Sequence, residues 1–212
     1  AVLLSVVVRI GAPDGCANFV LPQVCAAIGD AHPDLELQIV ALPRILNLSK
    51  READMAIAVS PPQTGRLVVQ KVSEYQLHMV ATDELRKSVQ PIETVEDLKH
   101  QPIGVYISEM IFDRELDYLS EMGLSHVRFA SNSVSVQFHL VCQGAGFGIV
   151  HDFALPFGRD LVKILPDQIA LARTFYLIRH ADDQRSERLT RLARLIAQGV
   201  RAEVARLEAL SL

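Results

Sequence analysis

The chain has 212 residues, of which 50% are hydrophobic and 22% are charged, and its formal net charge is -4. This composition supports a substantial buried core and excludes a disordered polypeptide. It disfavours a free-standing nucleic-acid-binding domain, which is usually basic, and no apolar run reaches the roughly 18 residues that span a bilayer.

The cysteines and the first residues indicate the cellular compartment. The chain has three cysteines, Cys16, Cys25 and Cys142, without CxxC spacing. A sparse, odd set is typical of a reducing cytoplasm, where such residues are usually small buried side chains. The apolar start of the chain has the pattern of a strand and no basic segment before it, so we predict no signal peptide. We therefore expect a cytoplasmic protein.

Strand and helix signals alternate along the first 60 residues. An apolar strand at 4–10 is broken by Gly-Ala-Pro-Asp-Gly at 11–15, and a helix with apolar residues at helical spacing follows. Strands at 35–42 and 55–59 flank a short helix near 45–51. This βαβαβ order with short connections predicts a parallel sheet covered by helices.

A second series begins after two extended segments at 67–72 and 76–81. Thr94 opens a short helix, and Asp97 stands at the fourth place of a weak capping box. The later elements alternate in the same way: strands at 103–107, 127–130 and 147–150, helices at 110–122 and 134–143, an extended run at 175–179, and a long helix at 184–210.

These two α/β series predict two lobes that are joined by two crossing segments. We assign 1–80 with 170–212 to lobe I and 81–169 to lobe II. Ligands of open α/β sheets bind outside the carboxyl ends of the strands. Two such lobes should therefore enclose a ligand-binding cleft.

The loop at 11–15 has two interpretations. It leads into a helix, and the unpaired N–H groups at a helix start can hold a ligand carboxylate or phosphate. Alternatively, it is an ordinary strand-to-helix turn with Asp14 as the cap. Asp14 would compete with an anionic ligand for the same N–H groups.

Gly144, Gly146 and Gly148 form a glycine-rich stretch. A dinucleotide fingerprint lies between a strand and the following helix, whereas these glycines lie between a helix and a strand. Ile149 also stands where the third fingerprint glycine belongs. We therefore predict a helix stop followed by a closely packed strand, and no cofactor.

Metal binding and enzyme chemistry are not expected. The seven histidines show no metal-ligand spacing such as HExxH, and neither a G-x-S-x-G elbow nor a P-loop occurs. His151 and Asp152 are adjacent, but neighbours on an extended segment point in opposite directions, so they do not form a catalytic pair. His151 follows a strand and is either a cleft residue or a surface or core residue.

The last helix contains six arginines, which could form a nucleic-acid-binding face. Apolar residues at core spacing and the interleaved Glu187, Glu203 and Glu208 favour a packed helix with a solvated outer face.

Several stretches resemble the regulatory domain of LysR-type transcriptional regulators, and together they cover nearly the whole chain. In chain order they are Val8-Arg9-Ile10-Gly11, Leu21-Pro22, His32-Pro33-Asp34-Leu35, Ala53-Asp54-Met55-Ala56, the segment 94–103, and Val141-Cys142-Gln143-Gly144-Ala145-Gly146-Phe147-Gly148-Ile149. The chain departs from the family pattern at Glu52-Ala53, where a glycine is frequent, at Thr82-Asp83-Glu84-Leu85, where His-Pro-Leu is usual, and in the His151-Asp152-Phe153 insertion.

The resemblance implies a type 2 periplasmic-binding-protein-like fold of two Rossmann-like lobes. It implies an effector-binding domain that senses a small molecule, pairs as a homodimer or tetramer, and contacts DNA only through an N-terminal winged helix-turn-helix that this chain lacks. A carboxylate or zwitterionic effector would suit Arg44. The expected pocket residues are Ala12, Pro13, Asp14, Pro43, Arg44, Ser108, Glu109, Asn132, Ser133 and His151. The alternative is an extracytoplasmic solute-binding protein of the same fold, which the missing signal peptide and the short length disfavour.

Overall fold

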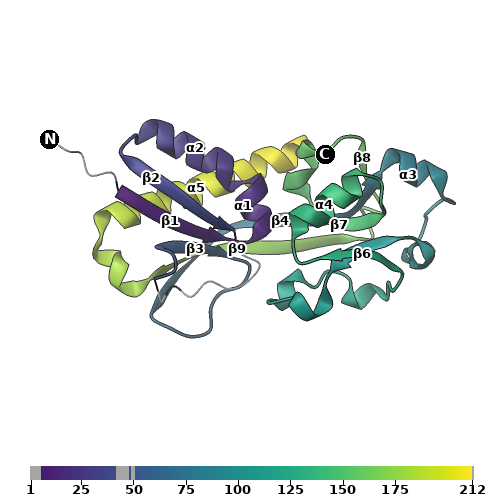
Figure 1. Cartoon of the computed structure of the whole chain (residues 1–212), viewed down its shortest axis with the longest axis horizontal. Helices are drawn as coiled ribbons and strands as arrows, with labels where there is room; N and C mark the ends of the chain where they lie inside the picture. Colours follow the sequence, from purple (N-terminus) through teal and green to yellow (C-terminus); the bar gives the residue numbers. More distant parts are fainter. Residues whose placement is uncertain (1–5, 42–47, 49–50, 212) are drawn as a thin grey trace. The chain divides into compact units, whose positions relative to one another are not determined.

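Figure 1 shows a computed structural model of the chain, which describes residues 6–41, 48 and 51–211. The chain forms two compact units: unit 1 is residues 1–74 with 174–206, and unit 2 is residues 75–173 with 207–212. Two of the divisions fall inside long strands, β4 (Leu67–Thr82) and β9 (Ala170–His180). The assignment of lobes at 1–80 with 170–212 and at 81–169 stays a prediction.

The sheet of unit 1 contains the parallel strands β1 (Val6–Ala12), β2 (Leu35–Ala41) and β3 (Met55–Ala58), together with β9 and the first part of β4. β1 pairs in parallel with β2 and with β3, and β9 pairs with β3 in the antiparallel direction. The parallel sheet predicted from the βαβαβ order is thus confirmed for β1, β2 and β3. The elements of this unit besides β4 and β9 are β1 (Val6–Ala12), α1 (Asp14–Phe19), α2 (Leu21–Ala31), β2 (Leu35–Ala41), β3 (Met55–Ala58) and most of α5 (Glu187–Leu210).

Arg9 and Asp54 connect β1 to the chain just before β3. The Arg9 N–H donates to the Asp54 carboxylate at 2.8 Å, and the Asp54 N–H donates to the Arg9 carbonyl at 2.9 Å. The Arg9 guanidinium donates to Gln38 Oε1, and Gln38 is its register partner on β2. Two of the motifs quoted above therefore hold neighbouring strands in register.

The helix predicted after the first strand is two helices. α1 ends at Phe19 and α2 begins at Leu21, with Val20 between them. Pro22 lies in the first turn of α2, where its missing N–H costs no helical hydrogen bond. In the interior of one continuous helix the same proline would remove a bond and collide with the preceding turn, so the chain starts a new helix instead.

The last helix is packed as predicted. Buried side chains repeat along one face of α5, at Leu192, Ile196, Val200, Val204 and Leu207. The five arginines of α5 are all exposed, and so is Arg185, which lies in the preceding 3-10 turn η7 (Ala181–Arg185); this confirms the solvated outer face. At Gly199, α5 passes so close to α2 that an added Cβ would lie 2.5 Å from Val24 Cγ1.

Unit 2 also contains three adjacent parallel strands, β5 (Ile103–Tyr106), β6 (Val127–Ser131) and β7 (Phe147–His151), together with part of β4 and the short strand β8 (Leu161–Lys163). β5 pairs in parallel with β6 and β7, and β4 pairs with β7 and β8 in the antiparallel direction. The two extended segments predicted at 67–72 and 76–81 belong to one continuous strand, β4. The further elements are α3 (Asp83–Ser88), η2 (Val95–His100), β5 (Ile103–Tyr106), η3 (Ser108–Met110), η4 (Arg114–Leu116), η5 (Ser120–Met122), β6 (Val127–Ser131), α4 (Val134–Cys142), β7 (Phe147–His151), η6 (Asp152–Phe157) and β8 (Leu161–Lys163).

The helix predicted at 110–122 is wrong, because this segment forms the short 3-10 turns η3, η4 and η5. Asp113 Oδ1 accepts the Glu115 N–H at 2.9 Å, and Asp117 Oδ1 accepts the Ser120 N–H at 3.3 Å. Such local bonds compete with the bonds of an α-helix. The apolar spacing indicated a helix, but Asp113 caps the start of η4 and Asp117 follows its end.

The predicted helix stop and the closely packed strand that follows it are confirmed. α4 ends at Cys142, and Gly144 has a φ of 73°. The Gly144 N–H donates to the Val141 carbonyl and the Ala145 N–H to the Leu140 carbonyl, which is the bond pattern of a Schellman motif. The other interpretation, a dinucleotide fingerprint, does not fit this geometry.

Candidate functional site

Three adjacent parallel strands of unit 2 end at the same edge of the sheet. β5 lies between β6 and β7, and the Ile107 N–H just after β5 donates to the carbonyl of Ser131 at the end of β6. The predicted pocket residues of this unit lie at the ends of these strands: Ser108 and Glu109 follow β5, Asn132 and Ser133 follow β6, and His151 is the last residue of β7. The edge therefore gathers polar groups from three loops, which is where ligands of such sheets bind.

The loop between β6 and α4 is held by its serines. The Ser133 N–H donates to Ser131 Oγ at 3.1 Å, and Ser133 Oγ accepts the Val136 N–H at 3.1 Å, as a helix cap does. The buried Gln137 amide donates to the Ser131 carbonyl at 3.2 Å. These bonds fix the loop and place the half-buried Asn132 at its tip, whereas Ser108 and Glu109 are exposed.

His151 lies in an aromatic cluster. Its side chain is buried and stacks on Phe153, with ring centroids 4.7 Å apart. The rings of Tyr75 and Tyr118 also surround it, at 5.5 and 6.3 Å. The core interpretation of this histidine therefore fits its surroundings in unit 2.

Asp152 turns away from His151 and joins a different cluster. Its carboxylate lies 2.6 Å from His78 Nδ1 and 3.1 Å from Lys163 Nζ. His78 is on β4, and Lys163 is on β8. The Asp152 carboxylate thus contacts residues of β4 and β8, and no local pattern in the sequence indicated these partners.

The predicted residues of unit 1 lie at the turn from β1 to α1. Ala12 is the buried last residue of β1, Pro13 is the N-cap of α1, and Asp14 is its first residue. The assignment of Asp14 as the cap is wrong, since Pro13 occupies that position and makes no side-chain cap bond. The Asp14 carboxylate instead accepts a hydrogen bond from the Asn18 amide at 3.1 Å. Pro43 and Arg44 lie outside the described residues.

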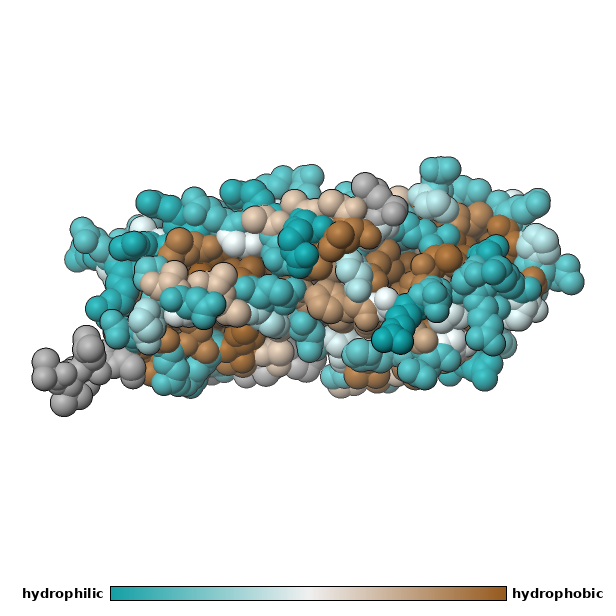
Figure 2. Space-filling model, turned by 90° about the horizontal axis from the view of Figure 1, so that it is seen from above, coloured by the Kyte–Doolittle hydropathy of each residue, from teal (hydrophilic) through white to brown (hydrophobic). Residues whose placement is uncertain are grey.

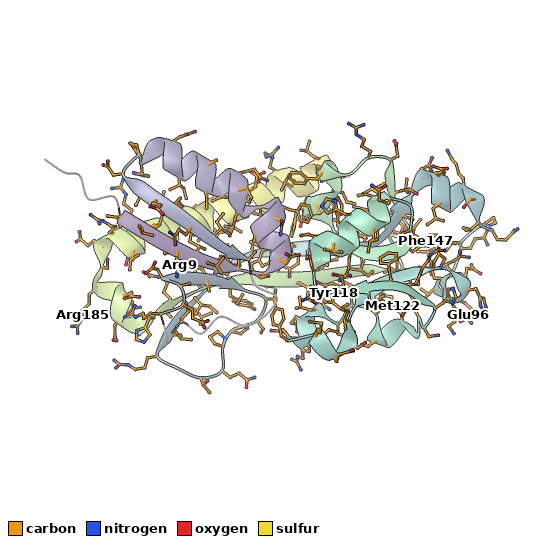
Figure 3. All side chains as sticks on the ribbon, in the orientation of Figure 1. Arg9, Glu96, Tyr118, Met122, Phe147 and Arg185 are labelled. Carbon is orange, nitrogen blue, oxygen red and sulfur yellow. The ribbon has the colours of Figure 1, made fainter. Side chains whose placement is uncertain are left out.

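A cavity of about 600 Å³ lies inside unit 2, along the 3-10 turns between β5 and β6. We call it the β5–β6 cavity. Ser108 and Gln137 line it, together with Tyr118, whose position in the turn segment is shown in Figure 3. Sequence reasoning missed Gln137 and Tyr118. Asp113 and Asp117 are the sequence signal that could have indicated Tyr118, because aspartates favour turns over a helix and Tyr118 lies in the turn segment. No such signal exists for Gln137.

The described residues contain no group of three or more His, Cys, Asp or Glu side chains that could hold a metal ion. In the same part of the chain, no helix combines the length and the apolar character needed to cross a membrane.

Comparisons with known proteins connect this geometry to a family. A family profile described as "LysR substrate binding domain" matches residues 3–201. A comparison with curated proteins gave no match.

Solved structures share the fold. The regulatory domain of CrgA, a LysR-type transcriptional regulator from Neisseria meningitidis, is similar with a TM-score of 0.79 and 16% identity over 92% of this chain and 99% of that chain. An OxyR2 regulatory domain from Vibrio vulnificus gives a TM-score of 0.73 and 17% identity over 94% and 97%. Full-length AphB from Vibrio cholerae gives 0.71 and 20% over 93% of this chain and 68% of AphB. The predicted two-lobed, periplasmic-binding-protein-like fold is thereby confirmed.

Proposed function

The chain belongs to the LysR substrate-binding domain family, and from this premise we propose that it binds its small-molecule effector at the carboxyl edge of β6, β5 and β7. The observation that carries the proposal is the convergence of three loops at this edge. In support, Ser108 and Glu109 are exposed, and the Ile107 N–H just before them donates to the Ser131 carbonyl just before Asn132 and Ser133.

The effector-binding domain of a transcriptional regulator fits the family, and an extracytoplasmic solute-binding protein is not favoured. The whole protein would contact DNA through a separate N-terminal domain and act in the cytoplasm. This chain would supply recognition and no chemistry of its own.

For the effector we propose a carboxylate or a zwitterion. Arg44 is the cation we expect to hold a carboxylate with two parallel hydrogen bonds. Glu109 could hold an amine, since its carboxylate follows β5 and is exposed. Ala12, Pro13 and Asp14 at the turn from β1 to α1, and Pro43 next to Arg44 in the sequence, are further candidates for binding the effector.

The test is a thermal-shift screen of organic acids and amino acids, because a ligand that binds only the folded form raises the melting temperature. For a compound that raises it, calorimetry on Arg44→Ala should show a loss of roughly 1.5–3 kcal/mol, and Asn132→Ala a loss of about 0.5–1.5 kcal/mol. Glu96→Gln is the control, since this glutamate is on η2 and its side chain is 72% exposed. If neither variant changes the affinity, the effector binds elsewhere.

We also propose a homodimer. β2 lies at the edge of the unit 1 sheet, and an apolar groove of about 360 Å³ runs between α2 and α5. Figure 2 shows apolar side chains gathered in patches between hydrophilic ones on the face turned to the viewer. An apolar surface around a two-fold axis can bury itself against its own copy. Sedimentation that shows only monomer at tens of micromolar would contradict the proposal.

A further inference from the structure

The β5–β6 cavity adjoins the edge at which we propose that the effector binds. Ser108 follows β5 at that edge and also lines the cavity, and so does Tyr106, the last residue of β5. The cavity of about 600 Å³ has the size of a pocket for a small organic ligand. An effector held at the edge can therefore extend into this space, so that the edge and the cavity form one site.

A buried side chain of the cavity wall, that of Gln137, is fixed by its neighbours. Gln137 lies in the first turn of α4, where its backbone N–H donates to the Ser133 carbonyl at 3.1 Å. Its Nε2 donates to the Ser131 carbonyl at 3.2 Å, and only 7% of the residue is exposed. A carbonyl can only accept, so the amide turns its nitrogen towards Ser131 and its oxygen away.

The oxygen of the same amide has no donor. Among the described residues no group donates to Gln137 Oε1, and this oxygen is not sealed off from its surroundings as the Tyr118 hydroxyl is. Buried polar groups are nearly always paired, with protein, water or ligand. Because Gln137 lines the cavity, a hydroxyl or N–H group of a molecule in the cavity can donate to this oxygen.

The charges of the wall decide which part of an effector can enter the cavity. They belong to Asp113, Asp117 and Arg114, and the Arg114 side chain is 94% exposed. Two carboxylates against one exposed guanidinium disfavour a further carboxylate inside the cavity. An acidic effector would therefore keep its carboxylate at the edge and place an uncharged part in the cavity.

The remainder of the wall contains both rings and polar groups. Tyr106, Phe112 and Tyr118 contribute rings, and the rings of Tyr106 and Tyr118 lie 6.0 Å apart. Ser120 and Gln137 contribute polar groups. A ring that carries a polar substituent suits this mixed wall better than a plain hydrocarbon does.

From these observations we propose that Gln137 selects the effector, by accepting a hydrogen bond from a hydroxyl or N–H group on the uncharged part that lies in the β5–β6 cavity. The inference rests on the proposed binding at the edge of β6, β5 and β7. It narrows the class of effector to a carboxylate whose body carries an uncharged donor. A body without that donor leaves the Gln137 oxygen unpaired in the complex and binds more weakly.

Three carboxylates of one length test for the donor: 3-(4-hydroxyphenyl)propanoate, its 4-methoxy analogue, and unsubstituted 3-phenylpropanoate. Calorimetry on the whole chain should show the hydroxyl compound binding about two- to tenfold more tightly than the unsubstituted acid, the range of one neutral hydrogen bond. The methoxy compound has only an acceptor and should bind no better than the unsubstituted acid. Equal affinities of the three, or no binding of any at about 10 mM, would overturn the proposal.

Gln137→Leu removes the oxygen and should abolish the preference for the hydroxyl compound. It also removes the bond to the Ser131 carbonyl, but a loosened loop would weaken the three probes alike and leave the ratio of their affinities unchanged. Gln143→Leu is the matched control and should keep the preference, because this glutamine is the exposed C-cap of the same helix and lies outside the cavity wall. A preference that survives in Gln137→Leu would refute the role of Gln137. The comparison of the probes on the unchanged chain decides even where this variant does not fold.

The position of the probe separates this inference from the proposed function. In amide NMR spectra, shifts at 108, 109, 132 and 133 with a ratio that does not depend on Gln137 would keep the effector at the edge and remove Gln137 from its recognition. A ratio that depends on Gln137, without any loss of affinity in Arg44→Ala, would support Gln137 and reject the proposed carboxylate contact.

Discussion

At the scale of single residues, Gly146 shows how closely the chain is packed where β7 begins. A Cβ added there would lie 2.5 Å from the Pro102 carbonyl oxygen and 3.0 Å from a ring carbon of Phe129. The Phe147 N–H donates to the same Pro102 carbonyl at 2.8 Å, so that backbone is not free to withdraw. Glycine is required at this position for space.

We predict that Gly146→Ala lowers the free energy of unfolding by about 1–3 kcal/mol, as overpacking of a core does. Gly29→Ala is the matched control, because Gly29 lies within α2 and an added Cβ meets nothing within 4 Å. The control should gain about 0.5–1 kcal/mol from higher helix propensity. Urea unfolding measures both, and equal effects of the two substitutions would contradict the packing argument.

The reactivity of two cysteines also depends on the surroundings of single residues. Burial raises the pKa of the Cys16 thiol well above its ordinary value, and it raises the pKa of Cys25 to about 11. At pH 7.5 both groups therefore remain thiols, and thiolate is the reactive form. We predict that iodoacetamide modifies them far more slowly in the folded protein than in urea, as mass spectrometry would measure. Equal rates in both states would disprove this.

At the scale of elements, Asp152 connects three of them: the strands β4 and β8 and the 3-10 helix η6. Its carboxylate contacts His78 on β4 and Lys163 on β8, and the aspartate itself begins η6. Only 4% of Asp152 is exposed, so water cannot replace these partners.

We predict that Asp152→Ala lowers the free energy of unfolding by about 2–4 kcal/mol, because it leaves the half-buried side chains of His78 and Lys163 without the carboxylate they contact. Lys163→Met should cost less, since methionine keeps the apolar part of the lysine chain. A double-mutant cycle of the two positions should give a coupling energy, and additivity of the two changes would show that the pair does not interact.

The end of α5 is attached to β4 by Glu208, whose Oε1 accepts the Gln76 N–H at 3.0 Å. Burial, followed by the nearby Asp152 charge, raises the pKa of Glu208 above its ordinary value of 4.5. The folded state therefore binds this proton more tightly than the unfolded state does. As pH rises from the unfolded to the folded pKa of Glu208, the ionised carboxylate comes to oppose folding.

Glu208→Gln should consequently raise the melting temperature at pH 7, and the gain should diminish as pH falls through the raised pKa and below 4.5. The glutamine carbonyl still accepts the Gln76 N–H, so the hydrogen bond is retained. Melting curves at a series of pH values measure the effect. A gain that is the same at every pH would show that the charge of Glu208 is not its cause.

At the scale of the whole molecule, the net charge affects whether the chain attracts nucleic acid. The formal net charge is -4, and the arginines of α5 are interleaved with glutamates. Phosphate backbones attract basic surfaces, and this chain has no large excess of positive charge.

We therefore predict that the chain by itself shows no sequence-selective binding to duplex DNA at about physiological salt. Gel shifts with operator fragments and scrambled controls measure this. A selective shift by this chain alone would show that the α5 arginines read DNA.

By itself, the sequence determined the alternation of strands and helices, the two α/β series, the packed face of α5 and the end of α4 at Gly144. Each of these depends on local patterns: apolar periodicity, and a glycine that tolerates a φ of 73°. The family motifs likewise placed Ser108, Asn132 and His151 at the ends of their strands.

Tertiary structure alone decided the antiparallel strands, the contacts of Asp152 with His78 and Lys163, and the β5–β6 cavity with Tyr118. Asp152 and His78 are 74 positions apart in the chain, and no local pattern encodes which partner a carboxylate meets after folding. The segment 110–122 has the apolar spacing of a helix, but the hydrogen bonds of Asp113 and Asp117 and the anchoring of Glu115 by Arg173 of β9 outweigh that preference.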